Sequence, residues 1–180
     1  IHDELLDAVV AATDKLGVGD PADPDTVVSA LINPGETDRV HSWIGEAVDA
    51  GATLATGGTL NDGVLAPTVL TGVTADMAVS HDEVFGPVIG FADYTDYEDA
   101  LRRANDTRYG LQAAVYTADL AKAMRAAEVL DFGGVLINEM PSFRTDQQPY
   151  GGVRDSGNTR EGPAFAIEEM TERRLIIIQP

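Results

Sequence analysis

Apolar residues near the start of the chain recur at the spacing of one helical face. Leu5, Val9 and Leu16 belong to this stripe, and Gly17 is the kind of residue that commonly ends a helix. The pattern predicts a helix over residues 1–16.

A stretch rich in Gly and Pro, residues 17–35, separates this helix from a second one. Its pairs Asp20-Pro21 and Asp23-Pro24 form turns, so the stretch is predicted to be an irregular surface loop. From about Glu36 the helical spacing resumes, and Gly51 marks the predicted end of the second helix. Short strands are predicted over the following residues, around turn signals that comprise Gly57-Gly58 and Asn61-Asp62-Gly63.

From Val88 onwards, apolar runs alternate with helical periods. Strands are predicted at Val88–Ala92, Ala113–Tyr116 and Val135–Ile137, and the two helices between them begin at Thr95 or Asp96 and at Asp119. The β-α-β-α-β order with continuous apolar strands predicts an α/β fold, a parallel twisted sheet with helices on both faces.

Residues 139–180 combine a long loop with two short elements. Glu139–Gly162 is polar and Gly-rich, and compact domains usually keep loops of this length for function. A helix over Pro163–Glu172 and an all-apolar strand at Leu175–Ile178 are predicted to follow. We assign residues 1–172 to one domain and residues 173–180 to a tail whose strand can pair elsewhere.

Acidic side chains outnumber basic ones by 30 to 12, so the formal charge is −18. Nucleic acid and anionic membrane surfaces both need a basic face, so the charge argues against either as a partner. The longest apolar run, Leu175–Ile178, is far shorter than the roughly 20 residues that span a bilayer. Residues 1–16 also lack the basic start of a signal peptide. These features predict a soluble, cytoplasmic protein.

Few residues indicate catalytic chemistry by their spacing alone. The chain has no cysteine, which excludes a thiol nucleophile and thiolate metal sites within it. His2, His41 and His81 are scattered without the spacing of metal ligands, so no metal site is expected. The run Tyr150–Gly157 does not follow a strand and open a helix, as phosphate-binding loops do.

The segment Glu83–Val88 immediately precedes a predicted strand and has two interpretations. In the structural one, Gly86-Pro87 makes a turn and Phe85 enters the core, and the residues by themselves favour this reading. In the functional one, Glu83 and Phe85 are held together on a rigid corner. A carboxylate can accept both hydroxyl protons of a ribose, and an aromatic ring can pack on the sugar or on nicotinamide.

A series of short motifs runs along the whole chain in a fixed order. They are Gly17–Pro21, Asp23–Thr26, Arg39-Val40, Ala47–Ala52, Gly57-Gly58, Pro67–Leu70, Glu83–Val88, Ala104-Asn105, Tyr109–Leu111, Gly134–Asn138, Gly151–Gly157 and Arg160–Gly162. Each is weak alone, but together they resemble the C-terminal, catalytic-domain part of the NAD(P)-dependent aldehyde dehydrogenase superfamily. Pro141–Asp146 and Ile167–Glu172 look most like its lactaldehyde, phosphonoacetaldehyde and non-phosphorylating glyceraldehyde-3-phosphate dehydrogenase branch.

The resemblance implies an enzyme that oxidises an aldehyde to a carboxylic acid with NAD+ or NADP+. In this family a cysteine thiolate attacks the aldehyde, hydride passes to the cofactor, and a glutamate activates the water that hydrolyses the thioester. Those groups and the N-terminal cofactor domain correspond to positions before Ile1. No catalytic residue is therefore assigned within this chain, which is expected to be inactive alone. The alternative is a non-catalytic assembly or binding module of the same fold.

The resemblance also assigns binding residues. Glu83 matches the glutamate that binds the nicotinamide ribose hydroxyls, and Phe85 matches the aromatic residue at the same end of the cofactor. Asn138 matches a family asparagine near the catalytic loop, although an asparagine that caps a turn explains this position equally well. We list Asn138 among the residues of the substrate pocket.

Three further residues of the expected substrate pocket lie in the long loop. Phe143 and Tyr150 fall where family members line the aldehyde pocket with aromatics, and core packing or loop anchoring explains them equally well. Arg144 is expected to bind a carboxylate or phosphate of the substrate, or else to pair with Asp146 or another aspartate. Leu175–Ile178 resembles the strand that completes a sheet of a neighbouring subunit, so we expect a homo-oligomer.

The charged residues are biased toward Asp and Arg. Of the 30 acidic residues 19 are Asp, and Lys occurs only twice against ten Arg. This composition is expected of a protein kept soluble in concentrated salt, where repulsion between exposed charges is screened within about 3 Å at 1 M. A GC-rich genome is the competing hypothesis, although it does not obviously raise the Asp content.

Salt adaptation predicts that the melting temperature rises from low salt to molar KCl, because added ions screen repulsion among the carboxylates. Thermal unfolding followed by circular dichroism across a KCl series measures this dependence. A melting temperature that stays constant or falls with KCl would refute salt adaptation.

Overall fold

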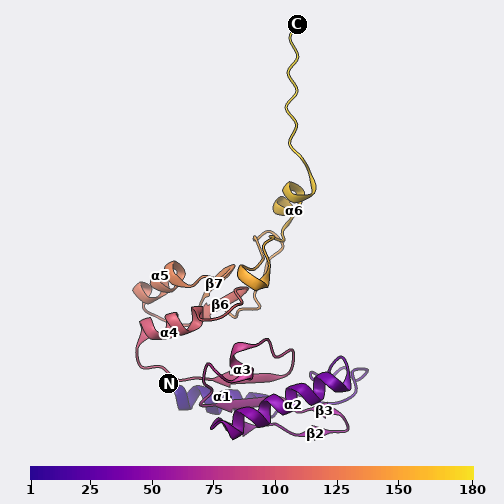
Figure 1. Cartoon of the computed structure of the whole chain (residues 1–180), viewed down its shortest axis with the longest axis vertical. Helices are drawn as coiled ribbons and strands as arrows, with labels where there is room; N and C mark the ends of the chain where they lie inside the picture. The colour runs from indigo at the N-terminus through magenta and orange to yellow at the C-terminus, as the bar shows by residue number, and fades with distance from the viewer. The chain divides into compact units, whose positions relative to one another are not determined.

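The computed structural model describes all 180 residues and divides them into two compact units, Ile1–Asp93 and Tyr94–Pro180. Each unit has its own hydrophobic core, and Figure 1 shows the elements of each. The border lies inside the stretch that the sequence pattern presented as one continuous β-α-β-α-β series. None of the helices has the length and apolar character that a bilayer crossing requires.

The helices of unit 1 are α1 (His2–Thr13), α2 (Pro34–Asp49) and the short α3 (Ala78–His81), which was not predicted. α2 begins two residues earlier than predicted, because Pro34 occupies the first turn, where its missing N–H is no loss. Asn33 caps it, since its Oδ1 accepts the backbone N–H of Glu36 at 2.9 Å. Between α1 and α2, the carboxylates of Asp20 and Asp23 each accept an N–H two residues on, which confirms the predicted irregular loop.

The strands of unit 1 are β1 (Thr53–Thr56), β2 (Leu60–Asn61), β3 (Val64–Leu65), β4 (Thr68–Thr71) and β5 (Val88–Phe91). β2 and β3 form an antiparallel hairpin across Asp62 and Gly63, which both have positive φ, as the turn signal predicted. The other three strands form one sheet in the order β1-β4-β5. In this sheet β4 is antiparallel to β1 and parallel to β5.

β4 is the buried centre of the sheet of unit 1. Val69 and Leu70 are both fully buried, and successive strand residues point to opposite faces, so protein covers both faces of β4. Leu70 belongs to the core cluster that α2 and α3 share. The buried hydroxyl of Thr68 accepts the N–H of Gly58 at 2.9 Å and donates to the carbonyl of Ala66 at 2.8 Å, so the sheet buries no unsatisfied group there.

The elements of unit 2 are α4 (Tyr97–Asn105), β6 (Gln112–Val115), α5 (Leu120–Val129), β7 (Gly134–Ile137), the 3₁₀ turn η1 (Arg154–Ser156) and α6 (Pro163–Met170). The side chains of Asp96 and Asp119 cap α4 and α5, as predicted. β6 and β7 pair in parallel, with Ala113 opposite Val135. The predicted parallel β-α-β crossover through α5 is therefore confirmed.

The grouping of strands differs from the prediction. β5 was expected to join β6 and β7 in one sheet, but it pairs with β4, whereas β6 and β7 form a separate two-stranded sheet. The backbone N–H of Thr68 donates to the carbonyl of Pro87 at 2.8 Å, which sets β4 and β5 in register from their first residues. The connection between β4 and β5 contains only the short α3, which was not predicted, so the local pattern did not indicate a crossover between these two strands.

Both helices of unit 2 pack on the same face of β6 and β7. Leu101 of α4 and Ala126 of α5 share a core cluster with Ala113 and Val135, two side chains that lie on one face of the sheet. Polar contacts also hold the helices to each other. The Tyr97 hydroxyl donates to the carbonyl of Lys122 at 2.8 Å, and the Arg125 guanidinium donates to Glu98 at 2.9 Å, a hydrogen bond that lowers the pKa of Glu98. These contacts explain why the two helices lie side by side.

The end of the chain forms no strand. α6 ends at Met170, two residues before the predicted end, and the side chains of Leu175–Ile178 are 71–85% exposed. This segment is the extended yellow end of the chain in Figure 1. A strand needs a partner for its backbone groups, which the single chain does not offer here. Pairing with a neighbouring subunit stays a prediction.

Gly133 and Gly151 of unit 2 allow two backbone segments to lie in direct contact. A Cβ added to Gly133 would lie 1.6 Å from the carbonyl oxygen of Gly151, a separation that no side chain can occupy. The N–H of Gly133 and the N–H of Val153 both donate to the carbonyl of Gly110 at 3.0 Å. The run Tyr150–Gly157 is thereby packed on the turn that precedes β7.

We expect Gly133→Ala to destabilise the protein by about 2–3 kcal/mol, because backbone atoms must move apart to admit the methyl group. Gly45→Ala is the matched control, since Gly45 lies inside α2 with open space around its Cα. Alanine there should stabilise the helix by about 0.5–1 kcal/mol. Urea denaturation followed by circular dichroism measures both changes. Wild-type stability for Gly133→Ala would contradict the backbone contact.

Candidate functional site

The segment between α3 and β5 places Glu83 and Phe85 on the surface and Val84, which is partly buried, against the core. Val84 packs against the core cluster of unit 1, and its two neighbours point outward. The side chain of Glu83 is exposed and makes no hydrogen bond or ion pair within the chain. Phe85 is 74% exposed. We name residues 83–85 the Glu83–Phe85 corner.

Phe85 has an unusual backbone conformation. Its φ is 48°, in the left-handed region that bulky residues seldom adopt and that costs about 1–2 kcal/mol. The interpretation that placed Phe85 in the core is therefore wrong, because its ring is exposed on a strained backbone. Strained residues held by their surroundings cluster at ligand sites, which favours the functional interpretation of the corner.

The corner has the chemistry that the nicotinamide end of a dinucleotide requires. A carboxylate accepts hydrogen bonds from both hydroxyls of a ribose, and an exposed aromatic ring can pack on the sugar or the nicotinamide. Nothing within the chain occupies the Glu83 carboxylate, and the Phe85 ring lies largely uncovered. The residues present therefore fit this part of an NAD(P) cofactor.

Asn138 follows β7 and has a φ of 57°. Its Oδ1 accepts the N–H of Thr117 at 2.8 Å, and its Nδ2 donates to the carbonyl of Thr117 at 2.9 Å. Both polar atoms of the amide thus bind one residue just beyond β6. This geometry ties the carboxyl ends of β6 and β7 together, as the turn-capping explanation anticipates.

Arg144 and Tyr150 are brought together in a cluster with Glu161. The guanidinium carbon of Arg144 lies 4.5 Å from the centre of the Tyr150 ring, and its Nη2 donates to Oε2 of Glu161. Tyr150 and Glu161 also exchange two backbone hydrogen bonds, of 3.2 and 2.6 Å. The acid that pairs with Arg144 is therefore a glutamate rather than Asp146 or another aspartate. About half of the Arg144 side chain stays exposed.

Phe143 lies in the same loop and is also about half exposed. Its N–H donates to the carbonyl of Met140 at 3.0 Å, which closes a turn after β7. The ring belongs to neither core cluster, so core packing does not explain it. Its assignment to the substrate pocket stays a prediction.

Sequence reasoning missed Arg154, which organises the run Tyr150–Gly157. Its guanidinium donates to the carbonyl oxygens of Asn105 at 3.0 Å, of Thr107, and of Asp131 at 2.6 Å. The first two carbonyls lie at the end of α4 and the third just after α5, so Arg154 fastens both helix ends to the run. The only local signal was an arginine inside a Gly-rich stretch, because its partners lie 23 to 49 residues away.

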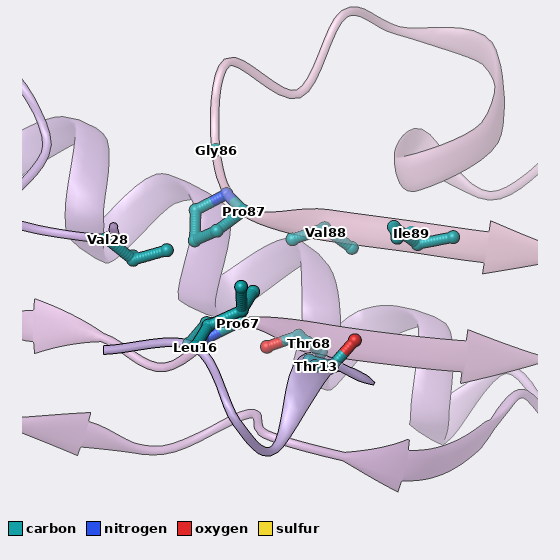
Figure 2. Close-up of a pocket in the computed structure, with 9 residues that line it drawn as sticks. All are labelled: Thr13, Leu16, Val28, Pro67, Thr68, Gly86, Pro87, Val88 and Ile89. Carbon is teal, nitrogen blue, oxygen red and sulfur yellow. The ribbon is translucent and has the colours of Figure 1, made fainter. Parts of the chain in front are cut away.

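A separate apolar cleft of about 290 Å³ opens in unit 1 where β4 and β5 begin (Figure 2). Its lining includes Leu16 of the segment after α1 and the prolines at the two strand entries, Pro67 and Pro87, and Ile89 extends it along β5. None of the predicted site residues lines it. Its lining contains no titratable side chain, so the cleft offers no catalytic group.

Comparison with protein families matches residues 1–176 to the aldehyde dehydrogenase family. The 3-sulfolactaldehyde dehydrogenase of Priestia megaterium is 42% identical over 178 residues, which make up 99% of this chain and 37% of that protein. The lactaldehyde dehydrogenase of Methanococcus aeolicus is 39% identical over 178 residues, 99% of this chain and 38% of that protein.

Solved structures of the same family superpose closely. Aldehyde dehydrogenase 21 from Physcomitrella patens, in complex with the reaction product succinate, gives a TM-score of 0.91 at 39% identity and covers 95% of this chain and 36% of that one. The glyceraldehyde-3-phosphate dehydrogenase GapN from Methanocaldococcus jannaschii, complexed with NADP, gives 0.88 at 39% identity over 93% of this chain and 36% of that one. An aldehyde dehydrogenase from Mycobacterium tuberculosis, complexed with NAD+, gives 0.86 at 32% identity over 94% and 36%.

These relatives agree with the resemblance drawn from the motifs, and two of the three enzyme types of the indicated branch occur among them. The chain spans a little over a third of the length of these two curated relatives, 37% of one and 38% of the other. Since the family match extends from residue 1 to residue 176, the chain belongs to the aldehyde dehydrogenase family.

Proposed function

We propose that this chain is the distal part of the catalytic domain of an enzyme that oxidises an aldehyde to a carboxylic acid with NAD+ or NADP+. The observation that carries the proposal is the Glu83–Phe85 corner, an unengaged carboxylate beside an exposed aromatic ring, in a chain of this family. Relatives complexed with NADP and with NAD+ support a nicotinamide cofactor without choosing between the two.

In this proposal the chain contributes binding, and the covalent chemistry lies elsewhere in the protein. The chain has no cysteine, so in this proposal the thiol nucleophile lies outside these 180 residues, together with the general base that activates water. When bound, the cofactor supplies a hydride acceptor. Glu83 holds the ribose through its hydroxyls and Phe85 restricts the adjoining ring, so the reacting carbon is held in place at a lower entropic cost.

Glu83→Gln in the full-length enzyme is expected to raise the KM for the dinucleotide about tenfold, because a neutral amide accepts hydroxyl protons more weakly than a carboxylate. The KM for the aldehyde should change little. Steady-state kinetics with each substrate varied in turn measure this difference. Glu128→Gln, which removes an exposed carboxylate from α5, is the control and should leave both constants unchanged. An unchanged dinucleotide KM for Glu83→Gln would remove Glu83 from the site.

We further propose that Arg144 binds an anionic group of the aldehyde. A guanidinium carries five N–H donors, and contact with Glu161 and with the face of the Tyr150 ring leaves donors for a second anion. The half-exposed side chain is accessible to such a group. One relative is named for 3-sulfolactaldehyde, an aldehyde that bears a sulfonate, which supports an anionic substrate.

Arg144→Ala in the full-length enzyme should raise the KM for an anionic aldehyde about tenfold and the KM for a neutral aldehyde of similar size less than about twofold. The reason is that only the anionic substrate loses a charge-assisted hydrogen bond. Kinetics on the two aldehydes, with the dinucleotide saturating, give the comparison. Arg102→Ala removes an exposed ion pair with Asp99 on α4, away from the long loop and the C-terminal tail, and serves as the control. Equal increases for both aldehydes would rule out the anion contact.

A further inference from the structure

We propose that Arg39 is a positioning residue for the nicotinamide end of the cofactor, because it fixes the backbone of the Glu83–Phe85 corner from α2. This inference rests on the proposed function of that corner. Nη2 of Arg39 donates to the carbonyl oxygen of Val84 at 2.8 Å. Val84 lies between the two candidate cofactor residues and 45 positions after Arg39.

The guanidinium of Arg39 is itself held from two sides. Its Nε donates to Oε2 of Glu36 at 2.8 Å, one helical turn earlier on α2. Its guanidinium carbon lies 4.2 Å from the centre of the Trp43 ring, one turn later. The side chain is only 28% exposed. Arg39 is therefore a fixed donor on a helix of sixteen residues rather than a mobile surface cation.

The bond to Val84 acts directly on the strained residue. The carbonyl of Val84 and the N–H of Phe85 belong to one rigid peptide plane. A hydrogen bond to that oxygen fixes the orientation of the peptide plane. It thereby limits rotation about the N–Cα bond of Phe85, whose φ is 48°. Without the bond, the plane can rotate toward a relaxed conformation, since the left-handed one is unfavourable for a bulky residue. The rotation would turn Phe85 and Glu83 away from their present directions.

The residue that follows the corner, Gly86, also lies close to α2. A Cβ added to Gly86 would lie 3.0 Å from the side chain of Val40, which is fully buried. Arg39 and Val40 are consecutive, so one turn of α2 binds the corner through a polar group and lies against the next residue through an apolar one. Because the packing of Val40 and Val84 remains when Arg39 is replaced, the loss should affect the corner more than the fold.

The test uses the full-length enzyme and two ligands, of which only one carries the part of the cofactor that would reach the corner. NADH or NADPH, according to the enzyme's preference, carries the nicotinamide ribose, whereas ADP or adenosine 2′,5′-bisphosphate lacks it. For Arg39→Met, fluorescence titration should show about tenfold weaker binding of the reduced dinucleotide. Calorimetric titration should show unchanged binding of the adenine nucleotide. Hydrogen exchange over residues 82–87 should be faster than in the wild type.

Arg125→Met is the matched control, because it removes an arginine that also pairs with a glutamate and contacts no residue of the corner. It should bind both ligands as the wild type does. If Arg39→Met does not fold, Arg39→Gln, which retains most of the side-chain stem, is expected to show the same selective loss.

Each remaining outcome is decisive. Wild-type binding of the dinucleotide by Arg39→Met, or equal weakening of both ligands, would overturn the positioning role. Glu83→Gln in the same titration separates this failure from that of the proposed function. If Glu83→Gln also binds the dinucleotide normally, the corner is not a cofactor site. If Glu83→Gln weakens binding and Arg39→Met does not, only the role of Arg39 is lost.

Discussion

Backbone polar groups between helices and strands must find hydrogen-bond partners, and in this chain a few long side chains supply them. Arg154 binds three carbonyls at the ends of α4 and α5. Asn105 accepts the N–H of Asp131 at 2.9 Å and donates to the carbonyl of Val129 at 2.6 Å. At the other end of the sheet, Asn138 accepts the N–H of Thr117 and donates to its carbonyl. The paths of the connecting segments depend on these contacts, because no regular ladder holds those segments.

The same contacts account for part of the charge pattern. Nine of the ten arginines form a hydrogen bond or ion pair within the chain. Most arginines are thus paired with groups of the chain itself. The carboxylates exceed the basic groups by 18, so the formal charge is −18. A negative corner is suited to the hydroxyls of a ribose and to the cationic ring of an oxidised nicotinamide, and it is unsuited to the phosphates of a dinucleotide.

The candidate site residues differ in how many of their polar groups and how much of their surface already have partners within the chain. Glu83 and Phe85 have no polar partner or cover within the chain, and strain is maintained at Phe85, so a ligand explains them best. Asn138 uses both ends of its amide to join two strands, which is a sufficient structural role. Arg144 is intermediate, since it has a partner in Glu161 and still exposes about half of its side chain. Membership of the family suggests which ligands these residues could bind. The hydrogen bonds and exposure of each side chain indicate which residues are available to bind them.

The sequence by itself determined the elements whose signals are local. Caps at Asp96 and Asp119, the turn at Asn61–Gly63 and the parallel pairing of β6 with β7 could all be predicted, because each depends on residues that are close in sequence or joined by one crossover. The ordered motifs likewise determined the family. The tertiary structure alone decided that β5 pairs with β4, that Phe85 faces outward, and that Arg39 reaches Val84. The contact of Arg39 with Val84 joins residues 45 positions apart, and the connection between β4 and β5 contains only the short α3, which was not predicted. Periodicity reports which face of an element is apolar but not which segment will cover it.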